Sequence, residues 1–64
     1  MDAEEKKQAL RQQKLKLLAA CRRYWIAKKL SAQDRTNTEF SANFKAEQNK
    51  MNEAIEVLMR LEES

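Results

Sequence analysis

The 64-residue sequence contains no glycine, no proline and no histidine, and it contains one cysteine. Glycine and proline are the residues that most often mark turns and end helices, so their absence leaves few tight turns available. The β-branched residues that favour strands are also scarce. Ala, Leu, Lys, Glu, Gln and Arg dominate, and because these are strong helix formers the composition predicts an all-α protein.

The same absences argue against several kinds of functional site. A disulfide framework needs several cysteines and a zinc site needs clustered cysteine and histidine, whereas Cys21 stands alone. Without histidine there is no ready general base, and without glycine there is no backbone loop of the kind that cradles phosphate. Cys21 also falls on an apolar helix side, where an inert thiol is expected. We therefore expect no catalytic residue, no metal and no cofactor.

Long hydrophobic segments are missing as well. The longest apolar run is "LLAAC", residues 17–21. A membrane-spanning helix needs about 20 apolar residues and a secretory signal needs about 7–15. A single cysteine also fits a reducing compartment. These features predict a cytoplasmic protein, which is either a complete small protein or a trimmed domain.

Each half of the chain carries its own apolar stripe. At about 100° per residue, Leu10, Leu17, Cys21 and Tyr24 share one side of a helix. The second half has a heptad pattern made by Phe40, Phe44, Met51, Ala54, Leu58 and Leu61. The two stripes point in different directions if the helix is continuous, so the chain is expected to break between them.

The break is expected within "SAQDRTNT", residues 31–38, which lacks strongly apolar residues and is rich in side chains that compete with the helix backbone. Thr36 and Glu39 form a T-x-x-E capping-box pattern. We predict a single domain over residues 1–64, a helical hairpin with helices at about 3–31 and 37–62 and a turn at about 32–36. A continuous coiled-coil helix and a chain that folds on binding remain alternatives.

Folding the chain about residue 34 pairs Leu10 with Leu58, Leu17 with Met51, and Tyr24 with Phe44. Lys14 and Lys28 fall on the same stripe, so each must either extend its ammonium group into solvent or find a carboxylate, for which Glu47 is the candidate. The predicted hairpin core contains Leu10, Leu17, Cys21, Tyr24, Phe40, Phe44, Met51, Ala54, Leu58 and Leu61.

The first helix has a second apolar side that one partner helix cannot cover. Leu15, Ile26 and Leu30 lie on this second side. Together with Trp25, which lies on or beside the first stripe, they are the candidate interface residues. An exposed apolar patch usually marks an interface, and a core this small seldom supplies more than about 3–5 kcal/mol. The simplest partner is a second copy, which would give a two-fold four-helix bundle. Docking on a larger protein is the alternative.

Positive charge is concentrated in the first half, as "CRRYWIAKKL" at residues 21–30 illustrates. Residues 1–30 carry nine Lys/Arg against three acids, and residues 31–64 carry four against seven. Candidate contacts for phosphate or an acidic protein are Arg11, Arg22 and Lys29 on one flank, and Lys16 and Arg23 on the other.

These patterns together predict a small non-enzymatic protein–protein interaction module, an adaptor or regulator that acts by helix packing. A nucleic-acid-binding helical dimer is the first alternative, because a basic helix suits phosphates. Binding to a membrane surface is the second alternative, and the spread of polar residues around the helix disfavours it.

Overall fold

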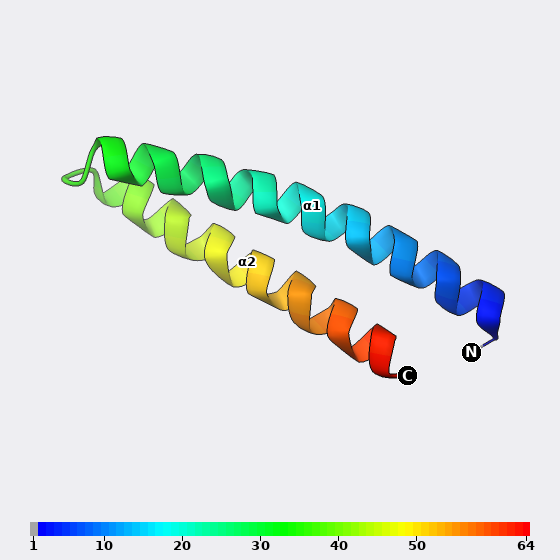
Figure 1. Cartoon of the computed structure of the whole chain (residues 1–64). Helices are drawn as coiled ribbons and strands as arrows, with labels where there is room; N and C mark the ends of the chain where they lie inside the picture. Colours follow the sequence, from blue (N-terminus) through cyan, green and yellow to red (C-terminus); the bar gives the residue numbers. More distant parts are fainter. Residues whose placement is uncertain (1) are drawn as a thin grey trace.

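The computed structural model describes residues 2–64, which form two α-helices. Helix α1 spans Ala3–Gln33 and helix α2 spans Thr38–Glu63. The two helices lie side by side and antiparallel (Figure 1), in a rod whose principal extents are 50 × 14 × 12 Å. The predicted all-α class and the helical hairpin are confirmed, and the alternative of one continuous helix is wrong. Neither helix is long and apolar enough to cross a membrane.

The turn between the helices is built by two short polar side chains. The backbone N–H of Asp34 donates to the carbonyl oxygen of Leu30 at 3.1 Å and so closes α1. The side-chain oxygen of Asn37 accepts from the backbone N–H groups of Glu39 and Phe40 at 3.0 and 3.2 Å and so opens α2. No residue from 2 to 64 has a positive φ. The hairpin therefore forms without glycine, because a backbone hydrogen bond closes α1 and the side chain of Asn37 caps α2, and neither arrangement needs a left-handed residue.

The predicted capping box at Thr36 is wrong, because the N-cap of α2 is Asn37. The hydroxyl of Thr36 donates instead to a carboxylate oxygen of Asp34 at 2.9 Å, within the turn. Helix α1 also continues two residues beyond its expected end at residue 31. Lys28 and Lys29 therefore lie before the last turn of α1, which contains no basic residue.

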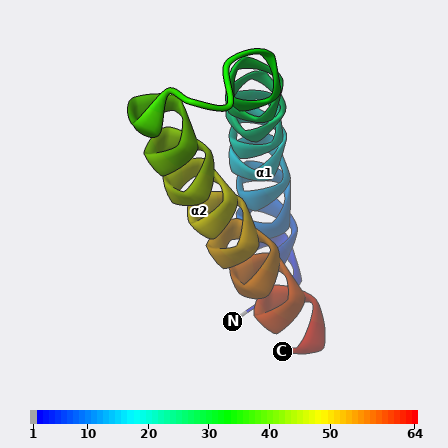
Figure 2. The ribbon, with the colours of Figure 1, turned by 90° about the vertical axis from the view of Figure 1, so that its left-hand side faces the viewer.

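The helices meet along a seam, which we call the inner seam, with alternating steps of three and four residues, the spacing of a coiled coil. It consists of Leu17, Ala20, Tyr24 and Ala27 on α1 and of Phe40, Phe44, Glu47, Met51, Ala54, Leu58 and Leu61 on α2. Tyr24 packs on Phe44 with ring centroids 5.5 Å apart and an interplanar angle of 42°, and the amide of Gln13 donates to the carbonyl oxygen of Ala54 at 3.2 Å. At the open end, the ammonium group of Lys6 donates to the carbonyl oxygen of Ser64. Figure 2 shows the two helices crossing at a small angle.

The most buried residues of the seam are small. Ala20 and Ala27 are 3% and 2% exposed, and no large side chain among the described residues is fully buried. All ten residues of the predicted hairpin core are half-buried. Ala20 and Ala27 were absent from that prediction. They alternate with Leu17 and Tyr24, so small side chains in α1 leave room for the larger ones of α2.

Glu47 is the one charged residue within residues 2–64 that is buried. Its carboxylate lies 3.3 Å from Nε of Arg23 on α1 and 3.6 Å from Nζ of Lys50. The expectation that Glu47 would pair with Lys14 or Lys28 is therefore wrong. Arg23 reaches Glu47 from the edge of the seam, and the exposed residues Lys14 and Lys28 lie within 4.0 Å of no Asp or Glu carboxylate in residues 2–64.

Candidate functional site

The side of α1 that faces away from α2 exposes an unusual number of large apolar side chains. Leu15 and Leu18 are each 60% exposed, Trp25 is 61% exposed and Ile26 is 54% exposed. We call this side of α1 the outer face. Leu30, at 37% exposure, lies at its edge. The outer face is the main apolar surface that the hairpin leaves uncovered.

The residues of this face form a second straight row along α1. Their successive steps of four, three, four, three and four residues match the spacing of the inner seam. We call this row the outer seam. It consists of Arg11, Leu15, Leu18, Arg22, Trp25 and Lys29, all of which are exposed. A row with this spacing can pack against another helix along its whole length.

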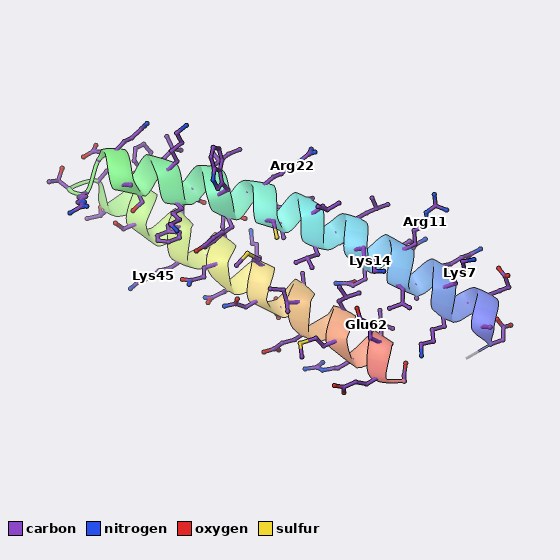
Figure 3. The ribbon with its side chains drawn as sticks, viewed as in Figure 1. Lys7, Arg11, Lys14, Arg22, Lys45 and Glu62 are labelled. Atoms are coloured by element: carbon purple, nitrogen blue, oxygen red, sulfur yellow. The ribbon has the colours of Figure 1, made fainter. Side chains whose placement is uncertain are left out.

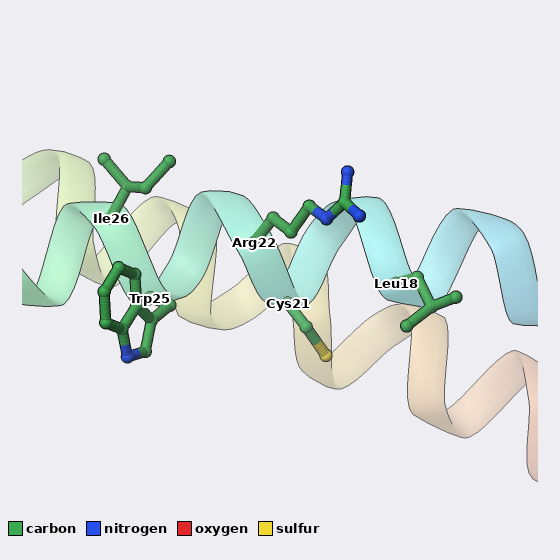
Figure 4. Close-up of a pocket in the computed structure, with 5 residues that line it drawn as sticks. All are labelled: Leu18, Cys21, Arg22, Trp25 and Ile26. Atoms are coloured by element: carbon green, nitrogen blue, oxygen red, sulfur yellow. The ribbon is translucent and has the colours of Figure 1, made fainter.

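An open groove of about 490 Å³ lies at the centre of the outer face. Leu18, Cys21, Arg22, Trp25 and Ile26 line it, and all five residues come from α1. Figure 4 shows Arg22 and Ile26 on one side of the groove and Cys21 on the other. The aliphatic stem of Arg22 adds to the apolar wall, while its guanidinium group extends into solvent. The groove is suited to an apolar side chain supplied by another molecule.

Two smaller depressions continue this surface towards the ends of α1, and both have basic rims. One, of about 400 Å³, is lined by Lys7, Leu10, Arg11 and Lys14. The other, of about 290 Å³, is lined by Trp25, Lys28, Lys29 and Ala32. In Figure 3, Arg11 and Arg22 extend from the side of α1 opposite α2. The exposed surface of α1 is therefore apolar around the groove, and basic residues flank the groove on both sides, at Lys7, Arg11 and Lys14 and at Lys28 and Lys29.

The charges on α1 are almost entirely of one sign. Residues 6–33 contain nine Lys/Arg and no Asp or Glu, and α2 contains six acidic and three basic residues. Within residues 2–64, Arg23 is the one cation of α1 that lies within 4.0 Å of a carboxylate. The ammonium group of Lys29 lies 5.0 Å from the centroid of the Trp25 ring, a cation–π arrangement. The outer face thus presents positive charge that the hairpin itself does not neutralise.

The structure brings two sets of sequence-predicted residues together on one surface. Arg11, Arg22 and Lys29 were proposed as phosphate or acidic-partner contacts, and they share the outer face with the proposed interface residues Trp25 and Ile26. The two residues predicted on the other flank differ in their contacts. Arg23 forms an ion pair with Glu47, whereas Lys16 is exposed and has no carboxylate partner in the described part of the chain.

Leu18 is the outer-face residue that the sequence analysis missed as an interface position. Leu18 was assigned neither to the predicted hairpin core nor to the predicted interface, although at about 80° from Leu10 it falls within the broad apolar side of the first helix. The sequence feature that could have identified Leu18 is its spacing, because it lies four residues before Arg22 and seven before Trp25, on the same side of the helix. In the part of the chain that the structure describes, no group of three or more His, Cys, Asp or Glu side chains could hold a metal ion.

Comparison of the chain with protein-family models, with curated proteins and with solved structures found no match. The functional conclusion therefore rests on the geometry and the charge of the outer face.

Proposed function

We propose that this chain is a non-enzymatic protein–protein interaction module, a small adaptor or regulator that packs the outer face of α1 on another protein chain. The observation that carries the proposal is the outer seam. It places Leu15, Leu18 and Trp25 in a straight, exposed row on the side of α1 that α2 does not cover. Exposed apolar surface that is continuous in this way usually marks an interaction site.

The modest burial within the hairpin supports the same proposal. Only Ala20, Ala27 and Glu47 are buried among residues 2–64, so every large apolar side chain of the seam keeps contact with solvent. A chain of this size buries a smaller fraction of its surface on folding than a larger domain does, and another helix packed on it would add apolar burial. The partner chain is a second copy, which completes a four-helix bundle, or a different protein.

Nucleic-acid binding is a second candidate, and the acid-free segment from residue 6 to residue 33 favours it. A positive helix attracts a phosphate backbone regardless of base sequence. The centre of the outer face fits this candidate less well. Leu15, Leu18 and Ile26 offer phosphates no partner, and a polynucleotide would leave them exposed to water.

Photo-crosslinking at position 25 tests the choice between these functions. The side chain of Trp25 is replaced by benzoylphenylalanine, and the full chain is irradiated in native extract. Adducts that a protease removes and nucleases leave intact are expected, because the outer face is proposed to contact protein. The same substitution at the exposed residue Asn52 of α2 is the matched control. Nuclease-sensitive adducts, or equal labelling from both positions, would contradict the proposal.

A further inference from the structure

We infer that the occupant of the outer face is an acidic amphipathic helix of a different protein, with apolar side chains at its centre and carboxylates towards both ends. The inference rests on the proposed function and names the chemistry of the partner. It follows from the order of surfaces along α1, which is basic around Lys7, Arg11 and Lys14, apolar around the groove, and basic again around Lys28 and Lys29.

The dimensions of the outer seam fit a helix. Arg11 and Lys29 are 18 residues apart, which is about 27 Å along a helix or five turns. A partner helix with coiled-coil spacing can therefore place one apolar side chain in the central groove and carboxylates opposite Arg11 and Lys29. Arg22 suits this arrangement, because its stem lines the groove while its guanidinium fork can hold a carboxylate in a bidentate pair.

The outer face of a second copy fits this face poorly because like charges would meet. Antiparallel pairing of two outer seams about the groove places Leu15 opposite Trp25 but Arg11 opposite Lys29, at both ends of the contact. Parallel pairing places each cation beside its own counterpart. Packed helices lie about 8–10 Å apart, within roughly one Debye length at physiological salt, so this repulsion is only partly screened. An acidic helix replaces the repulsion at both ends with attraction.

Binding to synthetic peptides tests the inference on the full chain. The first probe is a helical peptide of about 21 residues, with leucine at its central seam positions and glutamate towards both ends of the same face. The second probe has glutamine in place of every glutamate. Trp25 is the one tryptophan in the chain, so its fluorescence reports directly on the outer face.

We expect the acidic peptide to shift the emission of Trp25 to shorter wavelength, and the glutamine peptide to bind about tenfold more weakly. Arg22→Glu should weaken binding of the acidic peptide about tenfold or more, since it reverses the charge at the groove. The matched control is Lys45→Glu, which makes the same charge change at an exposed position of α2 and should leave the affinity within about twofold. Circular dichroism confirms that both variants remain helical.

Three results would overturn the inference in distinguishable ways. Equal affinity for the two peptides, or no binding of either, would show that the face does not recognise an acidic helix, and would leave the proposed function standing. At low salt, a peptide-free chain with a doubled mass and with Trp25 emission already at shorter wavelength than in the dilute monomer would assign the face to a second copy, which the proposed function also allows. A shift with single-stranded RNA or with phosphatidylserine vesicles, and none with the acidic peptide, would overturn both the inference and the proposed function.

Discussion

At the scale of single residues, Glu47 is a charged group placed where the inner seam calls for an apolar one. It occupies the seam position between Phe44 and Met51, and it is 9% exposed. Two cations, Arg23 and Lys50, satisfy it from the edges of the seam. Pairing a buried carboxylate in this way offsets the cost of removing it from water but seldom exceeds that cost.

Replacing Glu47 with leucine should therefore stabilise the hairpin, by about 1 kcal/mol, because the seam gains apolar contact and loses a desolvated charge. Urea unfolding followed by circular dichroism measures this difference. The control is Glu56→Leu, which removes the carboxylate of an exposed ion pair. In that pair, Oε2 of Glu56 lies 3.8 Å from Nη2 of Arg60. That change should leave stability within about 0.5 kcal/mol. A loss of stability in Glu47→Leu larger than in the control would show that the pair with Arg23 stabilises the hairpin.

At the scale of the elements, the turn depends on which residue caps α2. Asn37 satisfies two backbone N–H groups of the first turn of α2, whereas Thr36 makes one exposed hydrogen bond to Asp34. The backbone N–H groups in the first turn of a helix have no partner within the helix, so removing the side chain that caps them lowers stability.

Asn37→Ala should lower the free energy of unfolding by about 1 kcal/mol, and Thr36→Ala by less than about 0.5 kcal/mol. The two substitutions are neighbours in the same turn and remove polar side chains of similar size, so each serves as the control for the other. The measurement is the urea midpoint at unchanged slope. The reverse order of effects would restore Thr36 as the cap that the sequence pattern indicates.

Much of the hairpin could be predicted from the sequence, because the heptad spacing of the apolar residues identifies the side of each helix that packs on the other helix. Folding the two stripes about residue 34 predicted the contact between Tyr24 and Phe44 that the structure shows. The buried alanines at 20 and 27 were missed because alanine is a weak marker of a core, and their burial depends on the close approach of α2. Leu18 was also missed as an exposed interface residue, because the apolar surface of α1 extends well around its circumference from Leu18 and Trp25 to the residues that α2 covers.

At the scale of the whole molecule, the hairpin is a two-helix layer with unequal charge. Helix α1 carries nine basic and two acidic residues, and α2 carries three basic and six acidic residues. Attraction between the helices stabilises the hairpin modestly, because one ion pair joins α1 to α2 within residues 2–64 and its Arg23 side chain is 54% exposed. Most of the charge on α1 is therefore available to an external partner.

Salt should consequently have opposite effects on the two kinds of partner. Binding of the acidic peptide should weaken as salt rises, because its attraction to α1 is screened. Self-association through the outer face should strengthen, because screening removes the repulsion between Arg11 and Lys29 while the apolar groove is unchanged. At about 10 mM salt the Debye length is roughly 30 Å, and at 1 M it is roughly 3 Å. Sedimentation equilibrium should therefore give the chain mass of 7.5 kDa at low salt and a larger average mass at high salt.

Substitution of Leu18, at the centre of the outer seam, tests whether this self-association uses the outer face. Leu18→Gln should abolish the increase in mass at high salt, because it removes apolar contact from the groove. Met59→Gln, a comparable change at an exposed position of α2, should leave the increase intact. A dimer already formed at low salt and lost in Leu18→Gln would show that apolar contact outweighs like-charge repulsion on this face. The chain would then complete its bundle with a second copy, and an acidic helix would have to compete with that copy for the groove.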